Sequence, residues 1–155
     1  MVAIRQATLS DVPAMSALRE AVQWEGGAPA ERMRLYLAGE HHPRHALAPR
    51  AAFVADRGEA VIGYAAVHLT RRFGCEGELE WLLVAPEARG SGLADRLLRS
   101  AAGWLVQRGA HRVCVDVAPD NTRARRFYRR HGATDLDRCW MAWDDIAAAL
   151  DGPAS

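Results

Sequence analysis

The sequence has few cysteines and no excess of charge of either sign. Its three cysteines, Cys75, Cys114 and Cys139, lie far apart and form no C-x-x-C pair. This odd number argues against a disulfide framework or a zinc site and favours a reducing compartment, so we expect a cytoplasmic protein. Lysine and arginine total 20 against 19 aspartate and glutamate. No overall field therefore predicts binding to nucleic acid or to a membrane surface.

Long apolar runs are also missing. No stretch approaches the roughly 20 apolar residues that a membrane-spanning helix needs. The opening segment "MVAIRQATLSDVPAM" lacks the basic start and continuous apolar core of a signal peptide. The length suits one domain with a sizeable core. We expect residues 1–155 to form a single domain that ends in a short tail, residues 151–155.

The spacing of apolar residues predicts alternating strands and helices. Strands are expected at residues 2–7, 50–56, 60–70, 78–85, 111–119 and 139–143. Helices are expected at residues 10–24, 30–42, 91–108, 121–132 and 144–150. Ser10 and Asp11 are expected to cap the first helix, and Gly109 to end the third. This order predicts an α/β, or α+β, fold around a mixed sheet.

Two glycines stand one residue apart in "RGSGLADRLL", residues 89–98, where a strand gives way to a helix. A helix N-terminus leaves N–H groups unpaired and carries a partial positive charge, so a bare backbone there suits phosphate or pyrophosphate. The turn is not a Walker loop, because Leu93 and Ala94 follow Gly92 where Lys and Ser/Thr are needed. It also departs from a dinucleotide fingerprint, because Asp95 stands at the third glycine position.

A family resemblance rests on two motifs in the expected order. "VAPEARGSGLA" resembles the acyl-CoA pyrophosphate loop of the GNAT superfamily of N-acyltransferases, with its pattern of Arg or Gln, two residues, Gly, one residue, then Gly or Ala. "NTRARRFYRRHGA" is similar to the family's N-x-x-A-x-x-F-Y-x-x-x-G signature. The resemblance covers residues 4 to 143 and implies a GNAT-like fold, a mixed, mostly antiparallel sheet with helices on both faces. It also implies an N-acetyltransferase that uses acetyl-CoA as co-substrate.

The resemblance further implies which residues hold the donor. Backbone amides of the glycine loop would bind the pyrophosphate, and main-chain groups of the preceding strand would contact the pantetheine arm. The implied donor-binding residues are Leu82, Leu83, Val84, Arg89, Gly90, Ser91, Gly92, Leu93, Ala94, Asn121, Ala124 and Phe127. Asn121 would hydrogen-bond the pantetheine and can also cap its own helix, and both roles can hold.

Acyl transfer from a thioester to an amine needs a base, a donor for the oxyanion and an acid for the leaving thiolate. By resemblance Tyr128 is the acid, and a phenol with a pKa near 10 is protonated at neutral pH. The plainer interpretation is a core aromatic, because Tyr128 shares a helical face with Ala124 and His131. The oxyanion donor is expected from the backbone.

The segment "EGELEW" places acidic residues on the strand before the loop. Period-two alternation predicts that Glu78 and Glu80 share a face with Leu82 and Val84. Family members often draw a base from this strand, and we favour Glu80 over Glu78 because it is closer to the expected thioester. Burial against Trp81 would raise the Glu80 pKa to a useful value. Acidic residues on an exposed strand are also ordinary, so Glu78 and a water stay open as alternatives.

Two other clusters invite functional interpretations. One or two arginines of the fourth helix would meet the CoA 3′-phosphate, although such a run usually forms a solvated helix face. They are Arg123, Arg125, Arg126, Arg129 and Arg130. In "EHHPRH", residues 40–45, adjacent histidines point to different faces and Pro43 breaks the element, so we expect no metal. His68, at a strand end, has two interpretations, a place facing the acceptor cleft and a surface role, and we expect the surface role.

The sequence specifies the acceptor less closely than the donor. By resemblance residues 24–45 would line the acceptor side, and we expect a primary amine of a small molecule. The alternatives are a protein N-terminal or ribosomal-protein acetyltransferase, a CoA-binding sensor and a dinucleotide-dependent reductase. In "ATDLDRCWMAW", Ala133 stands at the family's aromatic position, and the segment is too short for two long strands. Because this edge often completes a pocket or a dimer contact, a partner subunit of a homodimer would cover it.

Overall fold

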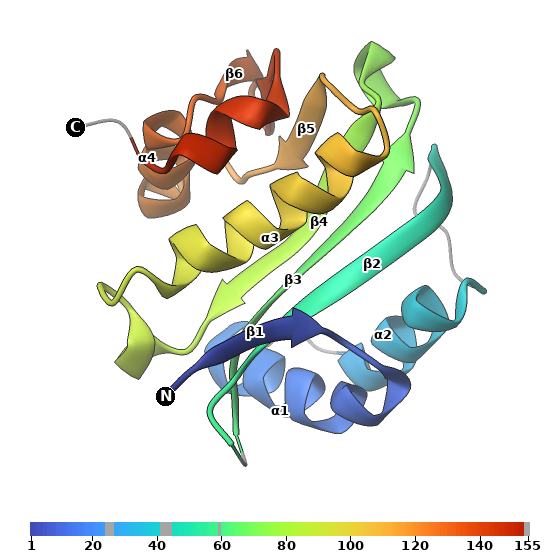
Figure 1. Ribbon diagram of the computed structural model, residues 1–155, viewed down its shortest axis with the longest axis vertical. Helices are drawn as coiled ribbons and strands as arrows, with labels where there is room; N and C mark the ends of the chain where they lie inside the picture. Colours follow the sequence, from blue (N-terminus) through green and yellow to red (C-terminus); the bar gives the residue numbers. More distant parts are fainter. Residues whose placement is uncertain (24–26, 41–44, 59, 154–155) are drawn as a thin grey trace.

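Seven strands form one sheet, in the order β1-β2-β3-β4-β5-β7-β6 (Figure 1). The computed structural model describes residues 1–23, 27–40, 45–58 and 60–153. The strands are β1 (Ala3–Gln6), β2 (Ala46–Asp56), β3 (Val61–Thr70), β4 (Gly77–Val84), β5 (Val113–Asp116), β6 (Thr134–Asp137) and β7 (Trp140–Trp143). The β4–β5 pair is parallel and the other pairs are antiparallel. The sheet is thus mixed and mostly antiparallel, as predicted.

Helices cover both faces of this sheet (Figure 1). The α-helices are α1 (Val12–Gln23), α2 (Pro29–Ala38), α3 (Leu93–Gln107) and α4 (Thr122–Arg130). Short 3-10 helices are η1 (Leu9–Asp11), η2 (Arg72–Gly74), η3 (Pro86–Ala88) and η4 (Ile146–Asp151). Helices α1 and α2 pack on one face, whereas α3, α4 and η4 pack on the other. The predicted α/β class is confirmed.

The two faces of β3 show how the sequence builds this arrangement. Tyr64 and Ala66 pack with α1 and α2, while Ala65 and Val67 pack with α3. Successive side chains of a strand point to opposite faces, so a strand covered on both sides must be apolar almost throughout. The apolar run of this strand from Val61 to Val67 is the consequence.

Helix α3 forms because its apolar positions recur at helical spacing. Leu97, Leu98, Ala101 and Leu105 are all buried against the sheet. Gly109 follows the helix with a φ of 79°, a left-handed conformation that favours glycine and ends the helix as expected.

Three helix boundaries differ from the predictions. Helix α2 ends at Ala38 because Gly39 adopts a φ of 78°, well before residue 42. The first helix is preceded by η1, and Asp11 accepts a 2.8 Å hydrogen bond from the Thr8 backbone N–H, so Ser10 is not the cap. The predicted last helix is a 3-10 helix, η4.

Strand β6 was missed. The strand expected at residues 139–143 is present as β7, but it forms a hairpin with a second four-residue strand, β6, that was not predicted. The turn is tight, and Asp137 accepts a 2.9 Å hydrogen bond from the Cys139 N–H across it. Leu136 is the one apolar residue of β6, which leaves too little alternation to indicate a strand.

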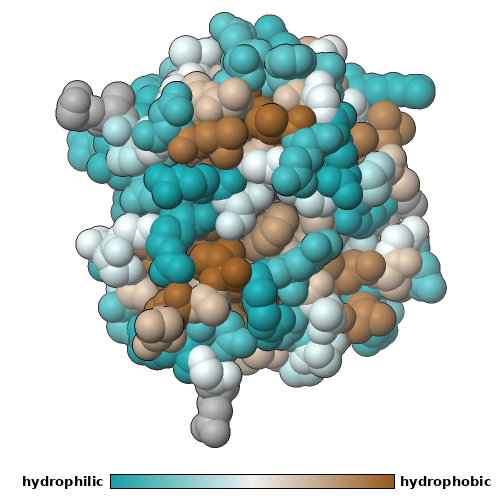
Figure 2. All heavy atoms as spheres, viewed as in Figure 1, coloured by the Kyte–Doolittle hydropathy of each residue, from teal (hydrophilic) through white to brown (hydrophobic). Residues whose placement is uncertain are grey.

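Hydrophilic side chains are spread over the face that carries α3, with apolar side chains in small groups between them (Figure 2). Among the described residues, no helix has the length and apolar character needed to cross a bilayer.

Candidate functional site

Strands β4 and β5 pair only where they begin. Gly77, Glu78 and Leu79 pair with β5, whereas β4 continues as far as Val84. Among the described residues, positions 82–84 of β4 pair with β3 and have no strand partner on the other edge. Leu82, Leu83 and Val84 are each half-buried there. The two parallel strands therefore leave an open edge of backbone beside the turn that leads into α3.

Gly77 lies where the two strands meet. A Cβ at this position would lie 2.6 Å from Leu105 Cδ2 and 3.2 Å from Val113 Cγ2, too close for any other residue without a shift. Glycine therefore allows α3 and β5 to pack closely against the start of β4.

The turn between β4 and α3 leaves a bare backbone at a helix N-terminus. Gly90 and Gly92 have φ values of 78° and 82°, which side chains rarely adopt. Gly92 is the N-cap residue of α3 and has no side chain to accept a capping hydrogen bond. The first backbone hydrogen bond of the helix is donated by the Arg96 N–H to the Gly92 carbonyl. Ser91 Oγ donates to the Ala88 carbonyl at 2.5 Å and so braces the turn. The amides at this end of α3 are positioned to bind an anion.

Helix α4 brings the second motif next to this turn. His131, which follows α4, lies with its Nε2 2.6 Å from Asp95 Oδ1 in the first turn of α3. The Trp143 indole N–H also donates to the His131 carbonyl at 2.9 Å. The first contact ties the end of α4 to the helix that starts at the glycines, and the second ties it to β7. In the sequence, Asp95 served only to exclude a dinucleotide fingerprint. In the structure it connects the first turn of α3 to the end of α4.

The residues predicted on α4 divide between packing and capping. Asn121 Oδ1 accepts a 3.2 Å hydrogen bond from the Ala124 N–H, so its capping role is present. Tyr128 is buried, and its ring meets that of Trp143 edge to face at 5.7 Å. Burial raises the Tyr128 pKa, which keeps the phenol protonated throughout the physiological range. Ala124 and Phe127 are half-buried against the same cluster.

Strand β4, which carries Glu78 and Glu80, contains a β-bulge at Glu80. Ala66 of β3 pairs with Trp81 and Val67 pairs with Leu79, so Glu80 is the extra residue between them. The bulge reverses the alternation. Before the bulge, Leu79 faces α3 and Glu78 points to the other side of the sheet. After the bulge, Trp81 and Leu83 face α2, whereas Leu82 and Val84 face α3.

The prediction that the two glutamates share a face with Leu82 and Val84 is therefore wrong. Glu78 and Glu80 lie on the side of the sheet that α2 covers, with ligand atoms within 4.8 Å of those of His68. Period-two counting fails here because a bulge inserts one residue.

The expected surface role of His68 is also wrong. His68 is fully buried on β3 and is the cross-strand partner of Glu78. Its Nδ1 lies 2.9 Å from Tyr36 Oη, and its Nε2 lies 3.7 Å from Glu78 Oε2. On the other side Arg72 Nε donates to Glu78 Oε1 at 3.0 Å. Four polar side chains from α2, β3, η2 and β4 thus form one buried cluster.

The two carboxyl groups have opposite pKa shifts. Burial and the charge of Glu78 raise the pKa of Glu80 to about 7. Glu78 is also desolvated, but interactions with His68 and Arg72 outweigh burial, so its pKa is lowered. Asp116 at the end of β5 has a raised pKa, caused by desolvation and by Glu78. Glu80 can therefore gain and lose a proton near neutral pH, whereas Glu78 stays ionised.

The arginines of α4 do not form a uniformly solvated face. Arg125 is buried; its guanidinium donates to the Val117 carbonyl at 3.0 Å and also contacts the carbonyls of Ala118 and Arg138. Arg125 and Arg129 both bind Asp135 of β6, at 3.2 and 2.8 Å. The remaining arginines, Arg123, Arg126 and Arg130, are exposed.

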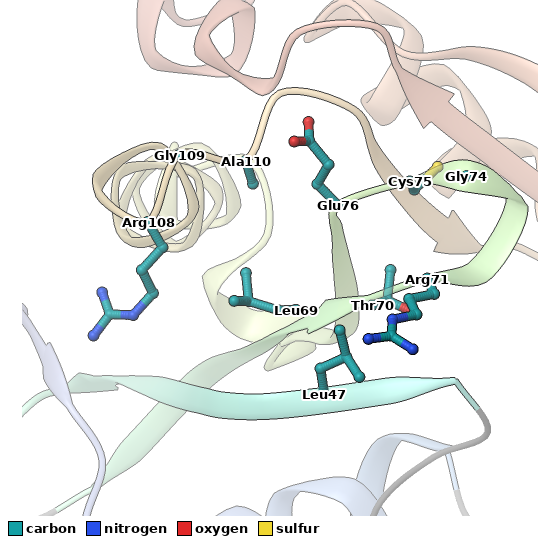
Figure 3. A pocket seen from close by; sticks show the side chains of 10 residues that line it. All are labelled: Leu47, Leu69, Thr70, Arg71, Gly74, Cys75, Glu76, Arg108, Gly109 and Ala110. Carbon is teal, nitrogen blue, oxygen red and sulfur yellow. The ribbon is translucent and has the colours of Figure 1, made fainter.

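A separate pocket lies at the opposite end of α3 (Figure 3). It has a volume of about 440 Å³ and is bordered by Leu47 and Leu69 of the sheet, Arg71, Glu76 and Arg108. None of the predicted catalytic or donor-binding residues lines it. Of the predicted acceptor-side segment, residues 24–26 and 41–44 lie outside the described residues, and so does most of the histidine-rich stretch.

The comparisons with known proteins agree with this geometry. A model of the acetyltransferase (GNAT) family matches residues 16–133. The chain belongs to this family. The predicted resemblance and fold are confirmed.

Two relatives illustrate the family's range. Mycothiol acetyltransferase of Pseudarthrobacter chlorophenolicus is 31% identical over 152 residues, which cover 83% of this chain and 47% of that protein. Aminoglycoside N(6′)-acetyltransferase type 1 of Serratia marcescens is 31% identical over 139 residues, covering 83% of this chain and 88% of that protein. The chain thus spans about half the length of the first, and it spans 65% of the same-named protein of Salmonella typhimurium.

A solved structure shares the fold. The PaiA N-acetyltransferase of Thermoplasma acidophilum, in complex with coenzyme A, has a TM-score of 0.70 at 15% identity. The similarity covers 92% of this chain and 98% of that chain.

Proposed function

We propose that this chain transfers an acetyl group from acetyl-CoA to a primary amine of a small molecule, by direct attack within a ternary complex. Family membership supports acetyl transfer. The observation that carries the donor site is the uncapped glycine turn of α3 beside the open edge of β4. A CoA pyrophosphate would accept hydrogen bonds from the amides between Arg89 and Ala94, and the pantetheine arm would lie along Leu82–Val84.

The carboxyl and phenol groups supply the proton transfers. Glu80 accepts a proton from the acceptor ammonium, whose nitrogen lone pair then attacks the thioester carbon. When the carbon–sulfur bond breaks, Tyr128 donates its proton to the thiolate, and its phenolate takes up the second proton that the nitrogen loses as the amide forms. Because burial raises its pKa, the phenol is protonated at neutral pH, as a proton donor must be. A backbone N–H of the open β4 edge would stabilise the oxyanion.

An acidic acceptor side favours a cationic amine. Glu78, Glu80 and Asp116 interact electrostatically with one another. A group of carboxylates raises the local concentration of ammonium ligands. The mycothiol and aminoglycoside relatives are named for small-molecule acetylation, which also favours a small acceptor over a peptide.

A thiol-release assay tests this function. Wild-type protein and acetyl-CoA are incubated with aminoglycosides, polyamines, amino acids and N-terminal peptides, and free CoA is measured. We expect release with at least one small amine, and mass spectrometry should find one acetyl group on its nitrogen. Turnover with peptides alone would favour protein acetylation. Binding of acetyl-CoA without turnover of any acceptor would favour a sensor and contradict the proposal.

A further inference from the structure

A buried imidazole nitrogen beside the two glutamates has no hydrogen-bond partner. Among the described residues no group forms a hydrogen bond with His68 Nε2, although His68 is fully buried. Leaving a buried polar atom unpaired costs free energy, so such an atom calls for an explanation. The nearest charged group is the Glu78 carboxylate, with Oε2 at 3.7 Å.

The Tyr36 hydroxyl and the Glu78 carboxylate together favour one position of the His68 proton. Burial raises the Tyr36 pKa, so the phenol is neutral and can donate to His68 Nδ1 across 2.9 Å. The imidazole proton then lies on Nε2 and points toward Glu78. The opposite tautomer would aim a lone pair of Nε2 at a carboxylate, which is electrostatically unfavourable.

Glu78 therefore meets N–H groups from two elements. Arg72 Nε donates to its Oε1 at 3.0 Å, and the His68 N–H faces its Oε2. The Cys114 thiol lies 3.9 Å from Oε1, and burial raises its pKa, so it adds no charge. Arg50 of β2 contributes a positive charge near Tyr36. Glu80 lies beside the anionic Glu78, with Asp116 of β5 nearby.

We propose that Tyr36 and His68 are positioning residues of the active site: together with Arg72 they keep Glu78 ionised, so that Glu80 alone exchanges the proton of the reaction. During acetyl transfer an N–H bond of the acceptor breaks and an O–H bond of Glu80 forms. Glu80 later releases this proton to solvent, while Glu78 keeps the same charge throughout. The catalytic role of the Glu80 proton rests on the proposed function. The protonation states of Glu78 and Glu80 can be measured without turnover.

A bound cation is the competing explanation of the cluster. His68, Glu78 and Glu80 offer ligand atoms that lie within 4.8 Å of one another. The Arg72 guanidinium, however, already lies 3.0 Å from Glu78 and fills the role of a positive partner. We therefore favour the proton arrangement and treat the cation as an outcome of the test.

The test is a ¹³C NMR titration of protein labelled at the glutamate carboxyls. Glu78→Gln and Glu80→Gln assign the two resonances. In the wild type we expect Glu80 to titrate with a midpoint of about 7, and Glu78 to remain a carboxylate below pH 4.5. His68→Leu removes an N–H donor that stabilises the Glu78 carboxylate, so Glu78 should share the bound proton with Glu80. The titration midpoint near pH 7 should then rise by about half a pH unit or more.

Matched variants separate this effect from packing. His68→Gln keeps an N–H near the position of Nε2 and should restore most of the wild-type titration. Tyr36→Phe, a milder change if His68→Leu does not fold, should shift the midpoint in the same direction. Tyr64→Phe, at another buried tyrosine on the same face, should leave both midpoints unchanged.

Three results would overturn the inference. One is a Glu78 resonance that titrates near pH 7 in the wild type. Another is a His68→Leu protein with unchanged midpoints. The third is a wild-type titration that EDTA shifts and Zn²⁺ restores, which would assign a cation to the cluster. Failure to turn over any acceptor would instead count against the proposed function and would not alter these titrations.

Discussion

Glu78 and Glu80 stand two residues apart on β4, yet their carboxyl pKa values move in opposite directions. Both groups are desolvated, so burial alone cannot separate them. The difference comes from their partners: Arg72 and His68 face Glu78, whereas Glu80 has an anion as neighbour. The assignment of Glu80 as the base rests on this contrast, and pairs of acids pushed apart in this way are typical of acid–base sites.

Glu80→Gln should lower activity and raise stability at neutral and alkaline pH. A carboxyl whose folded pKa is raised from 4.5 to about 7 binds its proton more tightly in the folded state. The wild type therefore loses stability as the pH rises through this window, and the amide variant does not. We expect the variant to be more stable by about 1 to 3 kcal/mol at pH 8, with little difference at pH 4.

Urea denaturation at both pH values measures this effect. A variant that is equally or less stable than the wild type at pH 8 would contradict the raised pKa. Turnover should fall by at least about a hundredfold if Glu80 is the base, and unchanged turnover would remove it from that role.

Tyr128→Phe should separate catalysis from packing. The ring keeps its edge contact with Trp143, so folding and CoA affinity should change little. Loss of the phenolic proton should lower kcat at least about tenfold, which is the usual order for general acid help. Steady-state kinetics and calorimetric CoA titration check this. Unaltered kcat would leave Tyr128 as a core aromatic only.

At the scale of elements, the proposed donor site depends on the turn between β4 and α3 and on its tie to α4. The bare N-terminus of α3 can receive an anion, and the Asp95–His131 contact at 2.6 Å holds α4 against that end. The two sequence motifs, some thirty residues apart, thus meet through Asp95, which follows the first motif, and His131, which stands at an unspecified position of the second.

Gly92→Ala should weaken acetyl-CoA binding. An alanine Cβ would find space, with Asp95 Oδ2 at 3.8 Å, but the φ of 82° is strained for any residue with a side chain. We expect a loss of about 1 to 2 kcal/mol in the free energy of unfolding, or a turn that relaxes and misplaces its amides. In either case the Kd for acetyl-CoA should rise several-fold, measured by calorimetry.

Gly103→Ala is the matched control within the same helix. Gly103 lies inside α3 with open space around the position of a Cβ. Alanine should stabilise the helix by up to about 1 kcal/mol and leave the Kd unchanged. Equal effects of the two substitutions on the Kd would contradict the role of the turn.

At the scale of the whole molecule, the sequence predicted what is local. Apolar spacing located α3, and the glycines and the asparagine motif located the ends of α3 and α4. The bulge at Glu80 could not be predicted, because it depends on how β4 pairs with β3. The burial of His68 depends on the same register, since His68 and Glu78 are cross-strand partners. Pairing the strands predicted at residues 60–70 and 78–85 residue by residue could have indicated that contact.

We propose that this fold holds the acyl donor between β4 and α4. A crystal structure of the protein with bound CoA is the decisive test. We expect pyrophosphate oxygens within hydrogen-bond distance of the amides between Arg89 and Ala94, and the CoA sulfur within reach of Tyr128 Oη. CoA bound elsewhere, such as in the pocket at the far end of α3, or a sulfur out of reach of Tyr128, would contradict it.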